Sequence, residues 1–107
     1  MEELALCTGF DWDEWNAAKI WAKHEVSQAE CEQVFFSEPL VVAEDVEHSK
    51  EEHRYYALGV TAKGRELFLV FTIRGRLVRV ITARDMSRRE RRVFRDVEAK
   101  GDTQVSE

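Results

Sequence analysis

Apolar residues near the start of the chain recur with the spacing of a helix. The segment "ALCTGFDWDEW" indicates a short strand or extended stretch that leads into a helix, with Asp13 as its N-cap. From there the positions i, i+3, i+4 and i+7 are Ala17, Ile20, Trp21 and His24. The pattern therefore predicts a helix with one buried face that reaches His24.

A second, shorter helix is predicted directly afterwards. The tetrapeptide "SQAE" at residues 27–30 is a capping-box sequence, in which serine and glutamate satisfy free backbone groups at a helix start. Cys31, Val34 and Phe35 supply its buried stripe. Pro39 cannot continue a helix, so we expect the helix to stop there.

After Pro39 the spacing changes to the alternation that is typical of strands. Four segments are strand candidates: "PLVVAED", "HRYYALGVT", "ELFLVFTIR" and "LVRVITAR". The turns "AKGRE" and "RGR" separate the last three, which favours antiparallel hairpins. Because both faces of these strands are largely apolar, we expect helices to cover one side of the sheet and a groove to form on the other.

A last helix is predicted from the capping-box sequence "SRRE" at residues 87–90 to about Ala99. Its inward-facing residues are expected to be Met86, Val93, Phe94 and Val97. Two helices, a meander of three or four antiparallel strands and a final helix make an α+β fold. We expect one domain over residues 1–100 and a frayed tail over residues 101–107.

The formal net charge of the 107-residue chain, −5, conceals a strong asymmetry. Residues 1–53 hold fourteen acidic and three basic residues, a balance of −11, whereas residues 54–107 hold thirteen basic and seven acidic residues, a balance of +6. The two balances sum to −5. Such polarity suggests two surfaces with different partners.

The composition also bears on the compartment. No run approaches the roughly 20 apolar residues of a membrane span, and the acidic N-terminus lacks the layout of a signal peptide. Cys7 and Cys31 are lone and widely spaced, which is neither a disulfide framework nor a metal-binding spacing. We therefore expect a cytoplasmic protein without membrane contact.

One face of the last predicted helix is basic. Its residues at i, i+3, i+4 and i+7 are Arg88, Arg91, Arg92 and Arg95. A solvated helix face is one interpretation. The other is a binding surface, because few acids are available for pairing along this helix and the planar guanidinium suits phosphate or carboxylate.

Two arginines lie on the last predicted strand. Strict alternation directs Arg79 to one face and Arg84 to the other. An unpaired buried guanidinium is costly, so Arg79 either pairs with an acid such as Glu66 or Glu52 or projects into a binding groove. Arg84, at the end of the strand, could reach the rim of that groove or cap a helix.

The three histidines allow more than one interpretation. His24 ends the first helix on its apolar face, where a structural role is the default, although an imidazole there could also transfer a proton. His48 and His53 flank "SKEE". Since no histidine or cysteine spacing matches a metal site and no phosphate-binding loop occurs, the sequence predicts neither a metal nor a cofactor.

Several short motifs occur in a fixed order along the chain: the Phe/Trp-Asp opening at residues 10–13, Lys23-His24-x-Val26, Asp45-x-x-His48-Ser49, Gly64-Arg65, and "RVITAR" followed by "RRER". With these motifs, residues 10–95 resemble the BrnT-type toxins of bacterial toxin–antitoxin operons. Each motif alone is weak, but their common order and spacing make the resemblance specific.

The resemblance implies a small curved antiparallel sheet packed by helices, similar to RelE-type messenger-RNA interferases. It also implies RNA cleavage without a metal ion or other cofactor. The implied partners are the RNA substrate and a ribbon-helix-helix antitoxin, with DNA contacted only indirectly through that antitoxin.

Metal-free RNA cleavage needs cations for the phosphorane and groups that transfer protons. The expected cationic residues are Arg65, Arg79 and Arg84, with Lys23 beside them. For proton transfer His24 ranks first, ahead of His48 and His53. These last two and the arginines at 88, 91, 92 and 95 are also expected to contact RNA or a partner.

The sequence departs from the family pattern at three positions. The family usually has glycine after the Lys-His pair, where this chain has Glu25, and a lysine and an asparagine of its first helix correspond to Asn16 and Ile20. A carboxylate beside Lys23 and His24 would repel phosphate. The alternative function is therefore a diverged, non-catalytic module that binds an acidic partner, and an α+β domain of unrelated role is a third.

Overall fold

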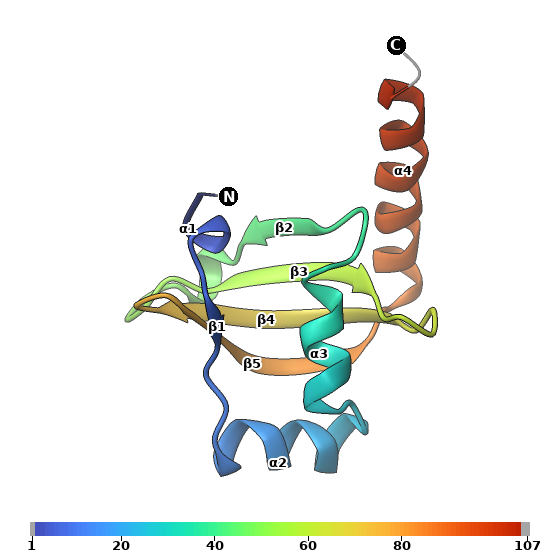
Figure 1. The fold of residues 1–107 in the computed structure, drawn as a ribbon. Coiled ribbons are helices and arrows are strands. Elements are labelled where there is room, and N and C mark those ends of the chain that lie inside the picture. Colours follow the sequence, from blue (N-terminus) through green and yellow to red (C-terminus); the bar gives the residue numbers. More distant parts are fainter. Residues whose placement is uncertain (1, 106–107) are drawn as a thin grey trace.

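The computed structural model describes residues 2–105, with the side chains of residues 2–101. The chain folds into one sheet with helices at its faces and ends (Figure 1). The helices are α1 (Glu2–Ala5), α2 (Glu14–His24), α3 (Gln28–Val34), the 3-10 helix η1 (Val46–His48) and α4 (Arg88–Val105). The strands are β1 (Gly9–Phe10), β2 (Val41–Glu44), β3 (Tyr55–Val60), β4 (Glu66–Arg74) and β5 (Leu77–Asp85).

The sheet has five strands in the order β1-β5-β4-β3-β2. Strands β2 to β5 form the predicted antiparallel meander, but β1 pairs with β5 in parallel, so the expectation of a purely antiparallel sheet of three or four strands is wrong. The parallel pairing is short, with Gly9 opposite Leu77 and Phe10 opposite Val78. Two residues are too few to show a strand period, which is why the sequence pattern missed the topology of this strand.

The three helix starts lie where the capping sequences predict them. Asp13, Ser27 and Ser87 each accept a hydrogen bond from the backbone N–H three residues later, at 3.2, 3.1 and 3.2 Å. The side chain of that third residue bonds back to the backbone of the capping residue in each case. These bonds satisfy donors that have no partner within the helix.

Helix α4 departs from its prediction. Met86 and Phe94 are buried as expected, each 2% exposed, but Val93 and Val97 are 45% and 36% exposed. The helix also extends past Ala99 to Val105, and residues 106 and 107 lie outside the described part of the chain. Figure 1 gives the reason: α4 packs against the sheet near its start and then projects beyond it.

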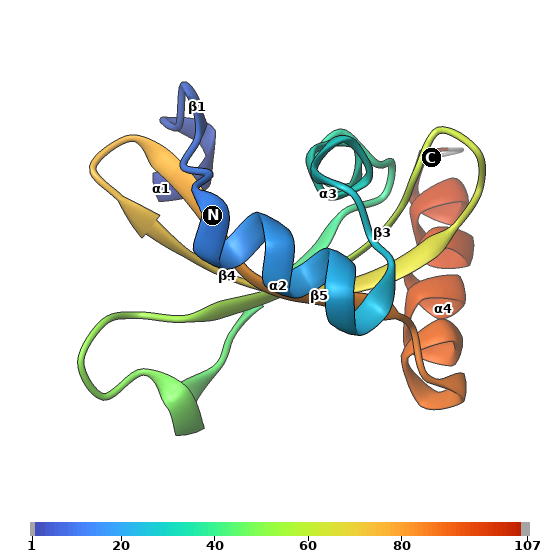
Figure 2. The ribbon, with the colours of Figure 1, turned by 90° about the horizontal axis from the view of Figure 1, so that it is seen from below.

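The two faces of the sheet are covered differently. Figure 2 shows α3 and β1 on one side, while η1 and the loop that follows it project from the other. A smaller core cluster, Leu58, Met86 and Phe94, lies where α4 meets the sheet, and the larger cluster lies under α3, with Val34, Leu69 and Phe71 among its members. Gly59 allows α3 to approach the sheet closely, because a Cβ at that position would lie 2.9 Å from Cγ1 of Val34.

A β-bulge changes the faces that two arginines occupy. Val70 is opposite Thr82, but the next residue, Phe71, is opposite Val80, so Ile81 is an extra residue in β5. The extra residue reverses the alternation beyond it. Arg79 and Arg84 therefore share the face opposite α3, and the prediction that they point in opposite directions is wrong.

Cys7 and Cys31 are free thiols. Burial raises the pKa of the Cys31 thiol to about 12. Among the described residues, no helix has the length and apolar character to cross a membrane.

Candidate functional site

The sheet face opposite α3 carries a half-buried apolar floor. Tyr56, Val70 and Thr82 are cross-strand neighbours on β3, β4 and β5, and each is only partly exposed. The ring of Tyr56 stacks on Phe68, with centroids 6.0 Å apart and planes at 26°. We call this surface, Tyr56, Phe68, Val70 and Thr82, the open face.

Two surface hollows share Glu52, Arg54 and Arg74, of which Arg74 lies on the same face of β4 as Val70. The first has a volume of about 600 Å³ and is lined by Glu47, His48, Lys50, Glu51, Glu52, Arg54 and Arg74. The second, of about 210 Å³, adds Trp15, Lys19 and Arg79 to the shared residues. Because lining residues are shared, the two hollows adjoin and form one basic trough beside the floor.

The charges in the trough are only partly neutralised. Arg74 lies 3.4 Å from Glu52. The side chain of Arg54 is half-buried and has no ion-pair partner among the described residues. Arg54 directly precedes β3 and Arg74 ends β4, and both line the first hollow, which therefore receives two guanidinium groups.

Arg79 is paired with acids, but not with the predicted ones. Its guanidinium lies 3.5 Å from Asp11 and 3.0 Å from Asp13, and the side chain is 14% exposed. Glu66 and Glu52, the predicted partners, bond Arg95 and Arg74 instead. Arg79 thus ties β5 to the start of α2 while it also lines the second hollow.

Arg84 mainly joins β5 to α4. Its guanidinium makes two hydrogen bonds to the Glu90 carboxylate, at 2.8 and 3.0 Å, and lies 4.1 Å from the ring centroid of Phe68. Burial acts to raise the pKa of Glu90, but the bonds from Arg84 and Ser87 outweigh it and the pKa is lowered. Arg84 thus holds the Glu90 carboxylate that completes the capping box of α4, but it does not cap the helix itself, because a guanidinium offers only donors and a helix start has free N–H groups.

Arg65 holds three elements together. Its side chain bonds Asp85 of β5 at 2.8 Å, Glu30 of α3 at 3.2 Å and the carbonyl oxygens of His24 and Glu25 at the end of α2. We call this arrangement the Arg65 clamp. The clamp joins α2, α3 and β5, and the catalytic role expected for Arg65 stays a prediction.

The clamp also shifts the pKa values of its acids. The hydrogen bonds from Arg65 lower the pKa of Asp85 despite its partial burial, and nearby cationic side chains add to the effect. Burial acts to raise the pKa of Glu30, but hydrogen bonds from Ser27 and Arg65 outweigh it and lower the pKa. Both carboxylates are therefore stabilised in their charged form.

Four of the five residues predicted to be catalytic lie at the end of the sheet where Arg65 bonds Asp85, and Arg79 lies apart from them. Lys23 and His24 lie at the end of α2, beside the Arg65 clamp. Arg84 directly precedes Asp85, and Arg79 lies five residues earlier in β5; since Ile81 is a bulge, the two arginines are four ladder positions apart, roughly 13 Å at the rise of a strand. The set is thus divided between two ends of the sheet.

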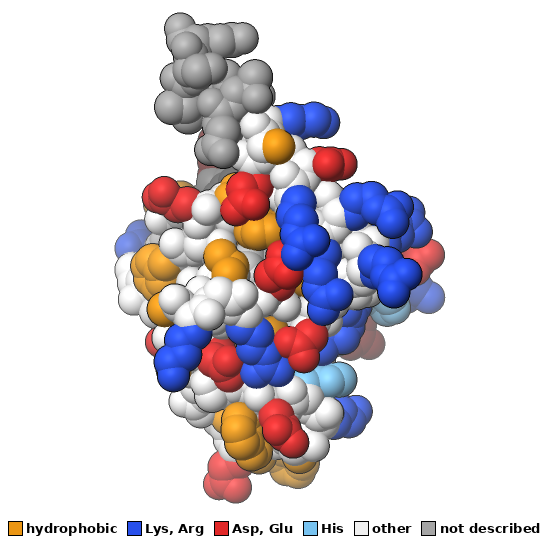
Figure 3. Space-filling view, turned by 90° about the vertical axis from the view of Figure 1, so that its right-hand side faces the viewer, with side chains coloured by type: hydrophobic (Ala, Val, Ile, Leu, Met, Phe, Trp, Pro, Cys, Tyr) orange, Lys and Arg blue, Asp and Glu red, His pale blue; other side chains and the backbone are white. Residues whose placement is uncertain are grey.

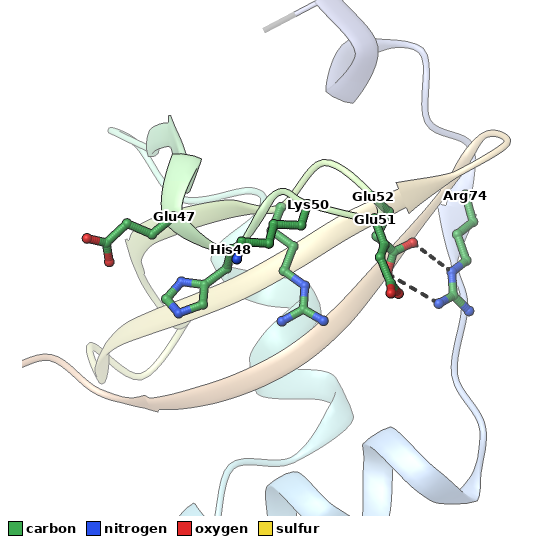
Figure 4. A pocket seen from close by; sticks show the side chains of 7 residues that line it. Glu47, His48, Lys50, Glu51, Glu52 and Arg74 are labelled. Atoms are coloured by element: carbon green, nitrogen blue, oxygen red, sulfur yellow. Dashed lines mark hydrogen bonds and ion pairs between the residues drawn. The ribbon is translucent and has the colours of Figure 1, made fainter.

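His48, which the sequence analysis placed behind His24 for proton transfer, lies against a carboxylate in the structure. Its Nδ1 atom lies 2.9 Å from one carboxylate oxygen of Asp45 and 3.1 Å from the other. Figure 4 shows His48 and Glu47 at one side of the first hollow and Glu52 and Arg74 at the other.

His53 lies outside this site. It contacts Glu44 at 3.0 Å and stacks on Tyr55, a residue of the core face. The structure therefore separates His48 and His53, which the sequence grouped together.

The basic stripe of α4 is divided as well. Arg91 and Arg95 both contact Glu66, at 3.5 and 3.2 Å. Arg88 and Arg92 have no ion-pair partner within the described residues, and all four arginines line one surface hollow. Figure 3 shows Lys and Arg side chains gathered over this helix, so the stripe is a solvent-facing basic surface.

The three departures from the family pattern have structural explanations. Glu25 is the C-cap of α2 and adopts the left-handed conformation, with φ 52°, which favours glycine. Asn16 is buried and donates to the backbone oxygens of Asp11 and Val80. Ile20 is part of the core.

Sequence reasoning missed Arg54, Lys19, Trp15 and Asp45 as members of the site. Arg54 could have been found, because it lies two positions before Tyr56 and therefore on the same face of β3. Trp15, which is 82% exposed, and Lys19 enter the trough only through the packing of α2 on β5. Among the described residues, no group of three or more His, Cys, Asp or Glu side chains is placed to hold a metal ion.

A comparison with models of protein families identifies the family of the chain. The sequence model of a family described as the ribonuclease toxin BrnT of type II toxin–antitoxin systems matches residues 12–90. The match covers more than half of the chain, including α2, α3, η1 and every strand of the meander. None of the curated proteins compared with the chain matches it.

Proposed function

The chain belongs to the BrnT family of ribonuclease toxins of type II toxin–antitoxin systems, and from that premise we propose that it cleaves RNA without a metal ion on the open face of its sheet. Attack by the 2′-hydroxyl on the adjacent phosphate would require no group beyond protein side chains and water. The overall arrangement is proposed to be RelE-like, with the curved sheet as the RNA-binding surface.

The observation that carries this proposal is the apolar floor beside a basic trough. Unpaired bases stack on aromatic side chains, and the partly exposed ring of Tyr56 lies on the open face beside Phe68, whose own ring is covered by Arg84. Guanidinium groups bind phosphate with planar, paired hydrogen bonds, and Arg54 and Arg74 line both hollows. Together these two surfaces would bind single-stranded RNA with its bases on the apolar floor and its phosphates against the arginines of the trough.

We further propose that a ribbon-helix-helix antitoxin neutralises the toxin and that the complex contacts DNA through the antitoxin alone. The site of action would be the cytoplasm, where messenger RNA is translated. The acidic net charge of the chain does not oppose RNA binding, because five cationic side chains and three acidic ones line the trough.

A second candidate function is a non-catalytic module that binds an acidic partner through α4. The observation in its favour is that Arg88 and Arg92 face solvent without an ion-pair partner among the described residues. Such a stripe would attract a carboxylate-rich segment. Under this alternative the chain would bind its partner and leave RNA intact.

The test is cleavage of an end-labelled single-stranded RNA by the purified chain, with and without EDTA. We expect fragments with 2′,3′-cyclic phosphate ends in both conditions. Arg54→Ala should slow cleavage and weaken binding, whereas Arg76→Ala, at an exposed turn position outside the trough, is the matched control. Intact RNA together with tight antitoxin binding would favour the second candidate, and cleavage only without EDTA would overturn metal independence.

A further inference from the structure

We infer that His48, oriented by the carboxylate of Asp45, takes the proton from the attacking 2′-hydroxyl of the RNA. The inference rests on the proposed ribonuclease function and names a catalytic residue and a positioning residue for it. It replaces His24, which the sequence ranked first for this role.

The first supporting observation is that the Asp45 carboxylate contacts the His48 ring instead of capping its own helix. Asp45 is the N-cap residue of η1, a position where the side chain ordinarily bonds a backbone N–H, yet it makes no such capping bond. Both of its oxygens lie instead within 3.1 Å of Nδ1 of His48. A carboxylate at Nδ1 favours the tautomer with the proton on that atom, which leaves the lone pair on Nε2.

The second observation is that the loop carrying this pair is fixed at both ends. The hydroxyl of Ser49 lies 2.6 Å from the carbonyl oxygen of Asp45 and accepts a hydrogen bond from the N–H of Arg54 at 3.0 Å. The N–H of Asp45 donates to the carbonyl oxygen of Arg54 at 2.8 Å. These bonds close the loop and hold Asp45 and His48 at a set distance from β3.

The third observation is the position of His48 relative to cations. It lines the same hollow as Lys50, Arg54 and Arg74, which could bind the phosphate next to the attacked bond. The acids of this hollow are Glu47, Glu51 and Glu52, and Glu52 is engaged by Arg74. In Figure 4 the carboxylate of Glu47 points away from the other side chains.

The proposed step balances without a further reactant. The lone pair on Nε2 takes the proton of the 2′-hydroxyl while the 2′-oxygen forms a bond to phosphorus. The bond between phosphorus and the 5′-oxygen breaks, and that oxygen takes a proton from solvent water. The products are a 2′,3′-cyclic phosphate and a free 5′-hydroxyl, and the imidazolium then returns its proton to solvent.

The other histidines lack this combination. His24 makes no side-chain hydrogen bond within the described residues, and its neighbours in the Arg65 clamp already have protein partners. His53 has a carboxylate partner, Glu44, but does not line the hollow. The pair of His53 and Glu44 is thus a matched control for the pair of His48 and Asp45.

The experiment compares His48→Ala with His53→Ala in the full chain. We expect His48→Ala to reduce the cleavage rate of single-stranded RNA about 100- to 10,000-fold, and His53→Ala to leave it near wild type. Binding of the same strand with 2′-deoxyribose at each position should be unchanged in both variants. Added imidazole should restore part of the activity of His48→Ala, an effect that loss of structure cannot produce.

The positioning role of Asp45 has its own readout. Asp45→Ala should lower kcat about 10- to 100-fold with little change in KM, by analogy with groups that orient catalytic side chains. Asp45→Asn, which keeps an acceptor for Nδ1, should retain more activity. Glu44→Gln is the control and should retain wild-type kcat.

The outcomes separate the two proposals. A wild-type chain that leaves RNA intact would refute the ribonuclease function and this inference with it. If the wild type cleaves and His48→Ala cleaves equally well, the function stands and His48 is not the base. Loss of binding in His48→Ala without rescue by imidazole would also overturn the inference, because it would indicate a binding or structural role.

Discussion

The Arg65 clamp and the hollow around His48 use the same kinds of side chain in different ways. In the clamp, one guanidinium has protein acceptors on three elements, and its side chain is 29% exposed. In the hollow, Arg54 has no ion-pair partner among the described residues, and Arg74 has one at 3.4 Å. Arginine whose donors are used internally contributes stability, whereas arginine with free donors is available to a ligand.

The difference also shows what the sequence left open about the arginines predicted to be catalytic. Arg65, Arg79 and Arg84 are all engaged by carboxylates. A sequence shows the guanidinium but not its partner, so the arginines that hold the fold together resemble those that bind a substrate. The comparison can be tested by removing members of each region.

The largest effect is expected for Arg65→Ala. The substitution leaves Glu30 and Asp85 unpaired and removes donors from the end of α2, which should lower the free energy of unfolding by about 2–3 kcal/mol for such partly exposed groups. Urea denaturation measures it, and Arg65→Lys should be intermediate because it lacks the planar fork. Wild-type stability combined with lost cleavage would instead make Arg65 part of the catalytic site.

The second-largest effect is expected from low pH, which should reduce the stability that the Arg65 clamp contributes. The pKa values of Glu30 and Asp85 are lowered in the folded state. The two carboxylates therefore contribute their full stabilisation above the pKa values of the unfolded chain, near pH 4. That stabilisation is lost as the pH falls through the pKa values of the folded state. The unfolding midpoint in urea, followed from pH 6 to pH 2.5, should fall less steeply in Arg65→Ala than in wild type. Parallel curves would show that the clamp does not set this dependence.

A gain is expected for Glu25→Gly, at the position where Arg65 contacts the last turn of α2. Glycine adopts φ 52° without the cost of a Cβ, so stability should rise by about 1 kcal/mol. Glu25→Ala removes the same carboxylate but keeps the Cβ, and it should show no gain. An equal gain in both variants would assign the effect to charge rather than to backbone conformation.

The smallest effect is expected for Arg54→Ala. Without an ion pair to lose, its free energy of unfolding should stay within about 0.5 kcal/mol of wild type. The same variant should weaken RNA binding, and the salt dependence of binding should become shallower by about one ion. A loss of stability comparable to that of Arg65→Ala would remove the distinction between the two regions.

Local features of the sequence determined most of the elements. The caps at Asp13, Ser27 and Ser87 set the helix starts because each bond joins residues only three positions apart. Alternation likewise located the strands of the meander, and ordered motifs indicated the family. The spacing of Asp45 and His48 was visible too, because that contact also spans three residues.

Tertiary structure decided what those elements form together. The parallel pairing of β1, the bulge at Ile81 that brings Arg79 and Arg84 to one face, and the partners of Arg65 all join residues far apart in the chain. The hollow that unites His48 with Arg54 and Arg74 likewise depends on a loop packed beside two strands. Such contacts follow from the register of the sheet, and register is not encoded in any one segment.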